Sequence, residues 1–252
     1  MYRNLYDAPL LYDRLRPPDP EDVRTALSLL GSHSARRVET IIDPACGPGS
    51  LLLAFAKLGY NVVGNDSSPE MCTVARKRLA GYICQITRGN MTSLPFVQSS
   101  VDAAVEISGV ACELSHAEFM NHMNSIFTLL RPGGIYILCL LDIDERCLAK
   151  LPARSWHSRV ETAEHIETIE YFIETYNPEI RCVQMRREAH TDDRLRTRDY
   201  YPLHMYDQAL LRTICNSFPE VSLVATINQG QDDIQHAFIR ETLHVFRKYG
   251  HD

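Results

Sequence analysis

The sequence has no long apolar run, no paired cysteines and no histidine pair at metal-ligand spacing, and each absence excludes a class of protein. No stretch reaches the ~18–20 apolar residues of a membrane span, and residues 1–15 lack a signal peptide's apolar centre. The eight cysteines include no C-x-x-C pair, so we expect free thiols and a cytoplasmic location. The ten histidines include no H-E-x-x-H pattern, so no metal site is expected.

Basic charge is also scarce. The formal net charge is −6 and the pI is ≈ 5.9, whereas a nucleic-acid-binding domain generally carries a basic face or a high pI. A nucleic-acid partner is therefore disfavoured. The sequence does contain one local basic cluster, which we interpret as the solvated face of strands: Arg181, Arg186, Arg187, Arg194, Arg196 and Arg198.

Short apolar strands alternate with amphipathic helices over the first part of the chain. Asp19 and Pro20 predict the start of a helix that ends at Gly31. Further helices are expected over 50–58, after Ser68, and over 115–130 with a capping box of Ser115 and Glu118. Strands are expected over 37–43, 61–65, 83–87, 102–107 and 135–141. This alternation predicts an α/β fold, a doubly wound, Rossmann-like and mainly parallel sheet.

After Asp142 the pattern changes to long, polar, strand-like segments. Segments 165–176, 179–190 and 194–202 predict a small antiparallel β elaboration after the fifth strand, followed by a helix over 203–218. Segments 221–227 and 238–247 predict antiparallel closing strands at the edge of the main sheet. We therefore expect residues 1–142 and 203–252 to form a ligand-binding core, and residues 143–202 to form an insertion that covers the substrate pocket.

The most informative stretch joins the first strand to the next helix and reads Asp43-Pro-Ala-Cys-Gly-Pro-Gly49. A glycine-rich turn lets a ligand approach the backbone, and ligands bind at the carboxyl ends of strands in such sheets. The turn lacks the dinucleotide pattern G-x-G-x-x-G. The carboxylate of Asp43 would repel a pyrophosphate and attract an ammonium group. S-adenosylmethionine carries an ammonium and a sulfonium but no phosphate, so the charge pattern favours it over NAD.

Two further anchors follow the next strands. Asp66 lies 19 residues after Gly47, and its carboxylate can accept two hydrogen bonds from a ribose diol. The alternative role of Asp66, a helix cap, is already filled by Ser68. Asn90 and Met91 follow the third strand, where a polar and a large apolar side chain could bind adenine; a simple turn is the alternative.

From Asp43 to Leu141 the chain resembles the class I S-adenosylmethionine-dependent methyltransferases. The stretch from Asp43 to Gly49 matches their first motif, D-x-[GA]-x-G-x-G, with Ala45 where many members have glycine. Asp66, Asn90 and Met91, Asp102 and Arg131-Pro-Gly-Gly match later motifs in the right order. The resemblance implies S-adenosylmethionine as cofactor and a set of cofactor-binding residues: Tyr6, Tyr12, Asp43, Ala45, Gly47, Pro48, Asp66, Ser67, Met71, Asn90, Met91, Ile107 and Ser108.

The flanks resemble small-molecule N-methyltransferases of the glycine and sugar-amine types. In those enzymes N-terminal tyrosines, here Tyr6 and Tyr12, cover the cofactor, and an antiparallel insertion forms part of the substrate pocket. The glycine-type enzymes also use an N-terminal arginine for the cofactor carboxylate, for which Arg14 and Arg16 are the alternatives. No Asn-Pro-Pro-Tyr signature follows the fourth strand, which disfavours acceptors such as nucleobases.

The predicted function is S-adenosylmethionine-dependent methyl transfer, by direct displacement, to a nitrogen or oxygen of a small-molecule acceptor. Candidate general bases are Ser108, Glu113, His116, Tyr201 and His204. Each has a structural alternative: His116 and Glu113 could be surface residues, and residues 200–204 a strand end that packs on the core.

Three other functions stay open. They are a methyltransferase acting on a protein or RNA, a scaffold or sensor that binds S-adenosylmethionine without catalysis, and a nicotinamide-dependent oxidoreductase, which the missing dinucleotide pattern disfavours. The oligomeric state is also open, with a homodimer among the options.

Overall fold

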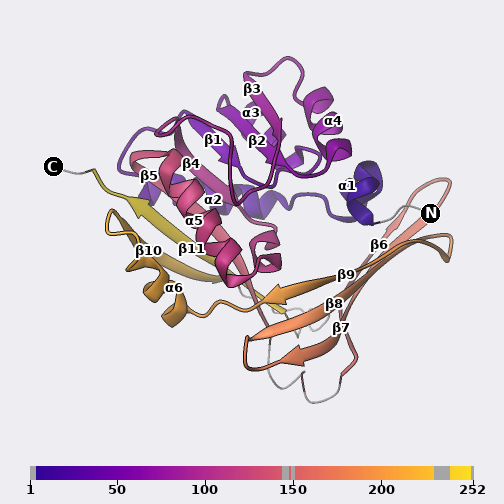
Figure 1. The fold of residues 1–252 in the computed structure, drawn as a ribbon. Coiled ribbons are helices and arrows are strands. Elements are labelled where there is room, and N and C mark those ends of the chain that lie inside the picture. Colours follow the sequence, from indigo (N-terminus) through magenta and orange to yellow (C-terminus); the bar gives the residue numbers. More distant parts are fainter. Residues whose placement is uncertain (1–3, 144–147, 149–150, 230–238, 251–252) are drawn as a thin grey trace.

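In the computed structural model the chain builds two β-sheets, described over residues 4–143, 148, 151–229 and 239–250 (Figure 1). Within these residues the main sheet has seven strands in the order β10-β11-β5-β4-β1-β2-β3. Its strands are β1 (Thr40–Asp43), β2 (Asn61–Asp66), β3 (Cys84–Arg88), β4 (Val101–Glu106), β5 (Leu130–Ile143), β10 (Val221–Gln229) and β11 (Ile239–Lys248). The second sheet has four antiparallel strands: β6 (Ala153–Glu161), β7 (Ile166–Asn177), β8 (Cys182–Thr191) and β9 (Arg194–His204).

The main sheet is parallel from β3 to β5, and β11 then pairs antiparallel with both β5 and β10. This arrangement confirms the predicted fold class, including the antiparallel closing strands and the separate antiparallel sheet. The helical segments are η1 (Leu5–Asp7), α1 (Pro9–Leu15), α2 (Pro20–His33), α3 (Ser50–Lys57), α4 (Pro69–Arg78), η2 (Val110–Glu113), α5 (His116–Leu129) and α6 (Gln208–Cys215). Because the parallel strands all end at one edge, the loops that follow them gather there.

Helices cover both faces of the main sheet (Figure 1). On one face α2, α3 and α4 pack on the strands through apolar side chains that include Leu30, Phe55 and Leu79. On the other face α5 and α6 pack through Phe127 and Ile214 among others. Strand β4 lies in the middle and is buried at all of its residues, as expected of a central parallel strand.

Helix starts follow the capping residues that the sequence provides. Ser68 is the N-cap of α4, with its hydroxyl accepting from the Met71 N–H at 3.2 Å. Ser115 and Glu118 form the predicted capping box at the start of α5. These caps fix where the loops after β2 and β4 end, and so place the residues that those loops carry.

The edge of the sheet opposite the strand ends is held by a buried carboxylate. Asp102 is 1% exposed and accepts from the backbone N–H groups of Glu39 and Thr40. It also pairs with Arg36 at 2.7 Å and with Arg131 at 2.9 Å. Burial alone would raise the pKa of Asp102, but these partners hold its pKa below the usual range. The Arg-Pro-Gly-Gly stretch is thereby joined to the chain that enters β1.

The N-terminal segment, residues 4–16, joins the two sheets (Figure 1). Its apolar residues, among them Leu5 and Leu11, form a small core with Ile169 and Ala189 of the second sheet. On the other side its Tyr6 carbonyl accepts from the Ser68 hydroxyl at 3.1 Å. The segment therefore closes over the edge where the parallel strands end.

Several element boundaries differ from those predicted. Gly31 does not end α2, which continues to His33, because the glycine has ordinary helical geometry and open space around it. Helix α6 begins only after its N-cap Asp207, since residues 203 and 204 complete β9. Strand β6 was not predicted, because its residues show no clear alternation of apolar and polar side chains.

None of the helices in the described ranges has the length and apolar character to cross a bilayer.

Candidate functional site

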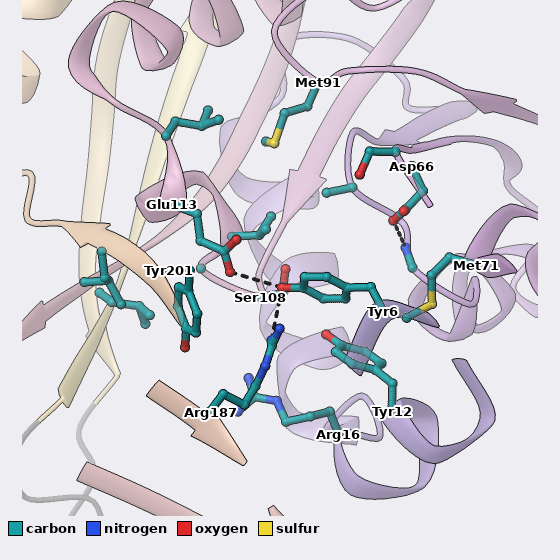
Figure 2. A pocket seen from close by; sticks show the side chains of 18 of the residues that line it. Tyr6, Tyr12, Arg16, Asp66, Met71, Met91, Ser108, Glu113, Arg187 and Tyr201 are labelled. Atoms are coloured by element: carbon teal, nitrogen blue, oxygen red, sulfur yellow. Dashed lines mark hydrogen bonds between the residues drawn. The ribbon is translucent and has the colours of Figure 1, made fainter. Parts of the chain in front are cut away.

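A cavity of ≈ 350 Å³ lies at the carboxyl ends of the parallel strands (Figure 2). Its walls come from the loops after β1, β2, β3 and β4, from the N-terminal segment and from the inward face of the second sheet. This volume falls in the range of small-molecule sites.

The glycine-rich loop after β1 forms one wall. Gly47 and Gly49 have φ values of +51° and +80°, a region that side chains rarely adopt. A Cβ at Gly49 would also lie 3.1 Å from Ala75 Cβ, so the close approach of this loop to α4 requires glycine. The Asp43 carboxylate accepts from the Ala45 N–H at 3.0 Å and is turned into the loop.

Asp66 is fixed at the end of β2 with its carboxylate on the cavity. Its two oxygens accept from the N–H groups of Gly47 at 2.8 Å and Ser68 at 2.9 Å. A carboxylate has about four acceptor positions, so each oxygen keeps a lone pair for a ligand. Burial raises the pKa of Asp66, which the backbone hydrogen bonds partly offset. The geometry suits two hydroxyl donors on adjacent carbons.

Asn65, which precedes Asp66, ties two loops together. It is 1% exposed, and its amide donates to the carbonyls of Pro44 and Gly89, both at 3.0 Å. Among the described residues its Oδ1 has no partner. A Cβ on Gly89 would lie 2.7 Å from that oxygen, which explains the glycine there. The residue lines the cavity and offers an acceptor for a ligand N–H.

Two methionines give the same end of the cavity an apolar surface. Met71 is 1% and Met91 9% exposed, and both line the cavity. The Asn90 carboxamide oxygen accepts from the Thr92 N–H at 2.9 Å, which forms a turn beside Met91. The Met91 carbonyl in turn accepts from Nδ1 of the buried His122 at 3.1 Å. A flat heterocycle fits between such side chains.

The N-terminal segment supplies two tyrosines and one arginine. The rings of Tyr6 and Tyr12 lie 5.9 Å apart and both line the cavity. The Arg16 guanidinium lies 4.7 Å from the centre of the Trp156 ring and makes no hydrogen bond or ion pair within the described residues. Arg14 instead makes a bidentate pair with Glu167 at 2.5 and 2.6 Å. Of the two candidate arginines, Arg16 therefore faces the cavity.

At the other end, a chain of polar contacts links the N-terminal segment to both sheets. The Tyr6 hydroxyl donates to Glu113 at 3.0 Å and accepts from Arg187 at 3.2 Å. Arg187 pairs with both oxygens of Asp199 at 2.9 and 3.0 Å. In Figure 2 the Tyr6 ring lies between Glu113 on one side and Asp66 and Met71 on the other.

The five candidate general bases differ in whether their side chains line the cavity. Glu113 and Tyr201 line the cavity, whereas His116 and His204 are not among its lining residues. Ser108 lines it, but the Ser108 hydroxyl donates to Glu106 at 2.6 Å. Burial raises the pKa of the Glu113 carboxyl, and the Arg187 guanidinium and the Tyr6 hydrogen bond oppose this shift. Glu113 is thus a carboxylate suited to taking up a proton.

Ten of the thirteen predicted cofactor residues line the cavity: Tyr6, Tyr12, Ala45, Gly47, Asp66, Ser67, Met71, Asn90, Met91 and Ser108. Asp43, Pro48 and Ile107 do not. Asp43 is 6% exposed and turned into its own loop, so the hypothesis that it faces a ligand ammonium finds no support in this geometry. The Pro48 carbonyl accepts from Arg78, and Ile107 packs against the core of α2, α3 and α4.

Sequence reasoning predicted an insertion over the pocket but missed most of the side chains that the second sheet contributes to the cavity. The lining residues it supplies besides Tyr201 are Ser155, Trp156, Tyr171, Met185, Arg187 and Leu203. Arg187 is 4% exposed, so the interpretation of the basic cluster as a solvated face is wrong at this residue. The signal was present as alternation, because Met185 and Arg187 share one face of β8 and Tyr201 and Leu203 share one face of β9.

Residues 41–134, which include the glycine-rich loop, Asp66 and the loop after β3, match the family model described as a methyltransferase domain. By this match, residues 41–134 form a methyltransferase domain. The match agrees with the methyltransferase resemblance predicted from the sequence, and it covers the strands and loops that build one side of the cavity.

Sequence relatives cover part of the chain. The methyltransferase domain is 33% identical over 102 residues to a demethylmenaquinone methyltransferase of Clavibacter sepedonicus, a match over 40% of each protein. The chain thus spans less than half of the length of this curated relative.

Solved structures share the whole fold. A sugar N-methyltransferase of Streptoalloteichus superposes with a TM-score of 0.74 at 14% identity, covering 99% of this chain and 95% of that one. An amino pentose methyltransferase of Micromonospora echinaspora, solved with S-adenosylmethionine bound, gives a TM-score of 0.66 at 18% identity, covering 96% and 98%. At such identities the likeness shows the fold, second sheet included.

Proposed function

We propose that this protein transfers a methyl group from S-adenosylmethionine to a nitrogen or oxygen of a small molecule by direct displacement. The observation that carries the proposal is the cavity at the strand ends, which presents the carboxylate Asp66 at one end and the half-buried carboxylate Glu113 at the other. The domain match and the names of the similar structures support the same activity.

The residues present fit S-adenosylmethionine. Asp66 offers two acceptors to the ribose hydroxyls, and Met71 and Met91 offer an apolar surface to adenine. The unpartnered Oδ1 of Asn65 matches the N–H groups of such a base. The guanidinium of Arg16, which lies over the Trp156 ring and lines the cavity, matches the cofactor carboxylate. When bound, the cofactor supplies a methyl group on a positively charged sulfur.

Three carboxylates gather at the strand ends, of which Asp66 lines the cavity, and they make this region favour a cationic ligand over a phosphate. Burial raises the pKa of Asp43, Asp66 and Glu106, because the charged forms lose water contacts. A bound cation would stabilise these charged forms, and a pyrophosphate would destabilise them further. The electrostatics therefore support S-adenosylmethionine and disfavour a nicotinamide dinucleotide.

We further propose that residues 143–202 act as a cover for the acceptor, and that Glu113 holds the proton which the acceptor gives up. Methyl transfer then depends mainly on orientation, because the sulfonium is already a strong electrophile. An acceptor that is enclosed by the second sheet and the N-terminal segment must be small, which favours a small molecule over a protein or RNA.

Arg16→Gln tests how the cofactor is held. We expect S-adenosylhomocysteine to bind this variant at least about tenfold more weakly in calorimetric titration, because a charge-assisted hydrogen bond is lost. Binding of 5′-methylthioadenosine, which lacks the amino-acid portion, should stay unchanged.

Arg159→Gln is the matched control, since Arg159 is 59% exposed on the edge strand β6. Equal weakening of both ligands by Arg16→Gln would contradict the assignment of Arg16 to the carboxylate.

A further inference from the structure

The acceptor end of the cavity, which is the end that contains Glu113, combines an apolar wall with the charged side chains of Glu113 and Arg187 and the hydroxyl of Tyr201. Met185 and Leu203 are 0% and 2% exposed on the second sheet, and Val110 of η2, Leu114 directly after it and Leu141 of β5 pack in the same apolar cluster and line the cavity with them. Hydroxyl groups of a polyhydroxylated acceptor that lay against this apolar wall would be buried without partners, which is unfavourable. An apolar ring or chain fits these walls.

The one arginine at this end is already neutralised. Arg187 is 4% exposed and makes a bidentate ion pair with Asp199. Its guanidinium also lies over the rings of Tyr6 at 4.5 Å and Tyr201 at 5.1 Å. The positive charge of Arg187 is therefore paired with a carboxylate of the protein, and its guanidinium plane is covered by two tyrosine rings.

Glu113 shares the field of Arg187 with Asp199 and makes no ion pair of its own among the described residues. Within the described part of the chain its side chain makes a single hydrogen bond, from the Tyr6 hydroxyl to Oε1. Two carboxylates, Glu113 and Asp199, thus face one guanidinium, which leaves one negative charge at the acceptor end. An ammonium group would neutralise it, and an anionic group would be repelled.

A phosphate would also lack a partner. Among the described residues that line the cavity, Arg16 and Arg187 are the basic ones. Arg187 is paired with Asp199, and Arg16 lies against Trp156 and Tyr171 and is assigned to the cofactor carboxylate. A nucleotide-linked acceptor would have no free cation to meet its diphosphate.

We propose that the acceptor is a primary or secondary amine on an apolar ring or chain, that it binds as an ammonium ion to Glu113, and that it carries no phosphate. This inference rests on the proposed function and narrows it from nitrogen or oxygen to nitrogen, and from small molecules in general to lipophilic amines.

Calorimetric titration in the presence of saturating S-adenosylhomocysteine tests the proposal. The probes are three matched pairs: phenethylamine and 2-phenylethanol, benzylamine and benzyl alcohol, cyclohexylmethylamine and cyclohexylmethanol. Thymidine diphosphate and glucosamine are added to represent nucleotide and polyhydroxylated acceptors. We expect at least one amine to bind about tenfold or more tightly than its alcohol, and tighter than thymidine diphosphate or glucosamine.

The variant Glu113→Gln should remove the preference for amine over alcohol, while Glu164→Gln, whose glutamate is 85% exposed in the turn between β6 and β7, should keep it. Binding of S-adenosylhomocysteine to each variant shows that it is folded; if Glu113→Gln fails this check, the wild-type comparison decides alone. Amines that bind no better than alcohols, tight binding of thymidine diphosphate, or a preference that persists in Glu113→Gln would overturn the proposal. Failure of the wild type to bind S-adenosylhomocysteine would instead refute the proposed function.

Discussion

The carboxylates of Asp66 and Glu106 are held in place by hydrogen-bond donors from the loops around them. The Asp66 carboxylate accepts two N–H groups, and Glu106 accepts from the N–H and hydroxyl of Ser108 at 2.8 and 2.6 Å. Such fixed acceptors need no rearrangement when a ligand arrives, so more of the interaction energy appears as affinity. The glycines of the first loop make this arrangement possible.

Two glycines provide a matched pair for testing this point. Gly49 has a φ of +80° and lies against Ala75, so we expect Gly49→Ala to lower the free energy of unfolding by about 2 kcal/mol or more. Gly31 lies within α2 with open space around it, so Gly31→Ala should raise the free energy of unfolding by about 0.5–1 kcal/mol. Urea denaturation measures both. A Gly49→Ala variant as stable as the wild type would show that the loop adopts another conformation.

Among the elements, the N-terminal segment matters most because it closes the cavity. Its α1 is tied to the main sheet by Arg78 of α4, which contacts Asp13 at 2.5 and 3.1 Å and the Pro48 carbonyl at 3.0 Å. The arginine side chain is 19% exposed, so this pair is less screened than a surface one. The same arginine thus joins the N-terminal segment to the glycine-rich loop.

Arg78→Met should therefore loosen the segment and leave the sheet intact. We expect faster amide hydrogen exchange over residues 5–16, with unchanged protection in β4 and β5. Lys77→Met, at the adjacent exposed position of the same helix, is the control. Equal exchange in Arg78→Met and the wild type would show that the apolar contacts of Leu5 and Leu11 hold the segment alone.

Elements with a strong local signal could be predicted from the sequence, and those that depend on distant partners could not. The helix caps at Ser68 and Ser115 and the loop from Asp43 to Gly49 are local, and their predictions are confirmed. The inward turn of Arg187 depends on Asp199 and Tyr6, which lie 12 and 181 residues away in the chain. Spacing along the chain carries no signal for such a contact.

At the scale of the whole molecule, two buried histidines link stability to pH. His122 is 0% exposed, with Nδ1 on the Met91 carbonyl and Nε2 2.7 Å from the Tyr136 hydroxyl, and His244 is 3% exposed. Burial lowers the pKa of both to about 4, from 6.5. Between pH 6.5 and 4 these histidines are protonated in the unfolded chain but stay neutral in the folded chain. The free energy of unfolding therefore decreases as the pH falls toward 4.

We expect each histidine to add up to about 1.4 kcal/mol per pH unit to the loss of stability between pH 6.5 and 4. Urea midpoints measured at several pH values give this slope. His244→Gln should flatten it, whereas His116→Gln at the exposed start of α5 should not. A slope that is the same in His244→Gln and the wild type would contradict a neutral, buried His244.

The whole molecule is proposed to bind S-adenosylmethionine at the ends of its parallel strands through Asp66. The most direct measurement is calorimetric titration of the wild type and Asp66→Ala with S-adenosylmethionine and S-adenosylhomocysteine, with NADH as a control. The account predicts binding of both adenosyl ligands, weakened about tenfold or more in Asp66→Ala, and no binding of NADH. Absence of adenosyl binding, binding that Asp66→Ala leaves unchanged, or tight binding of NADH would contradict it.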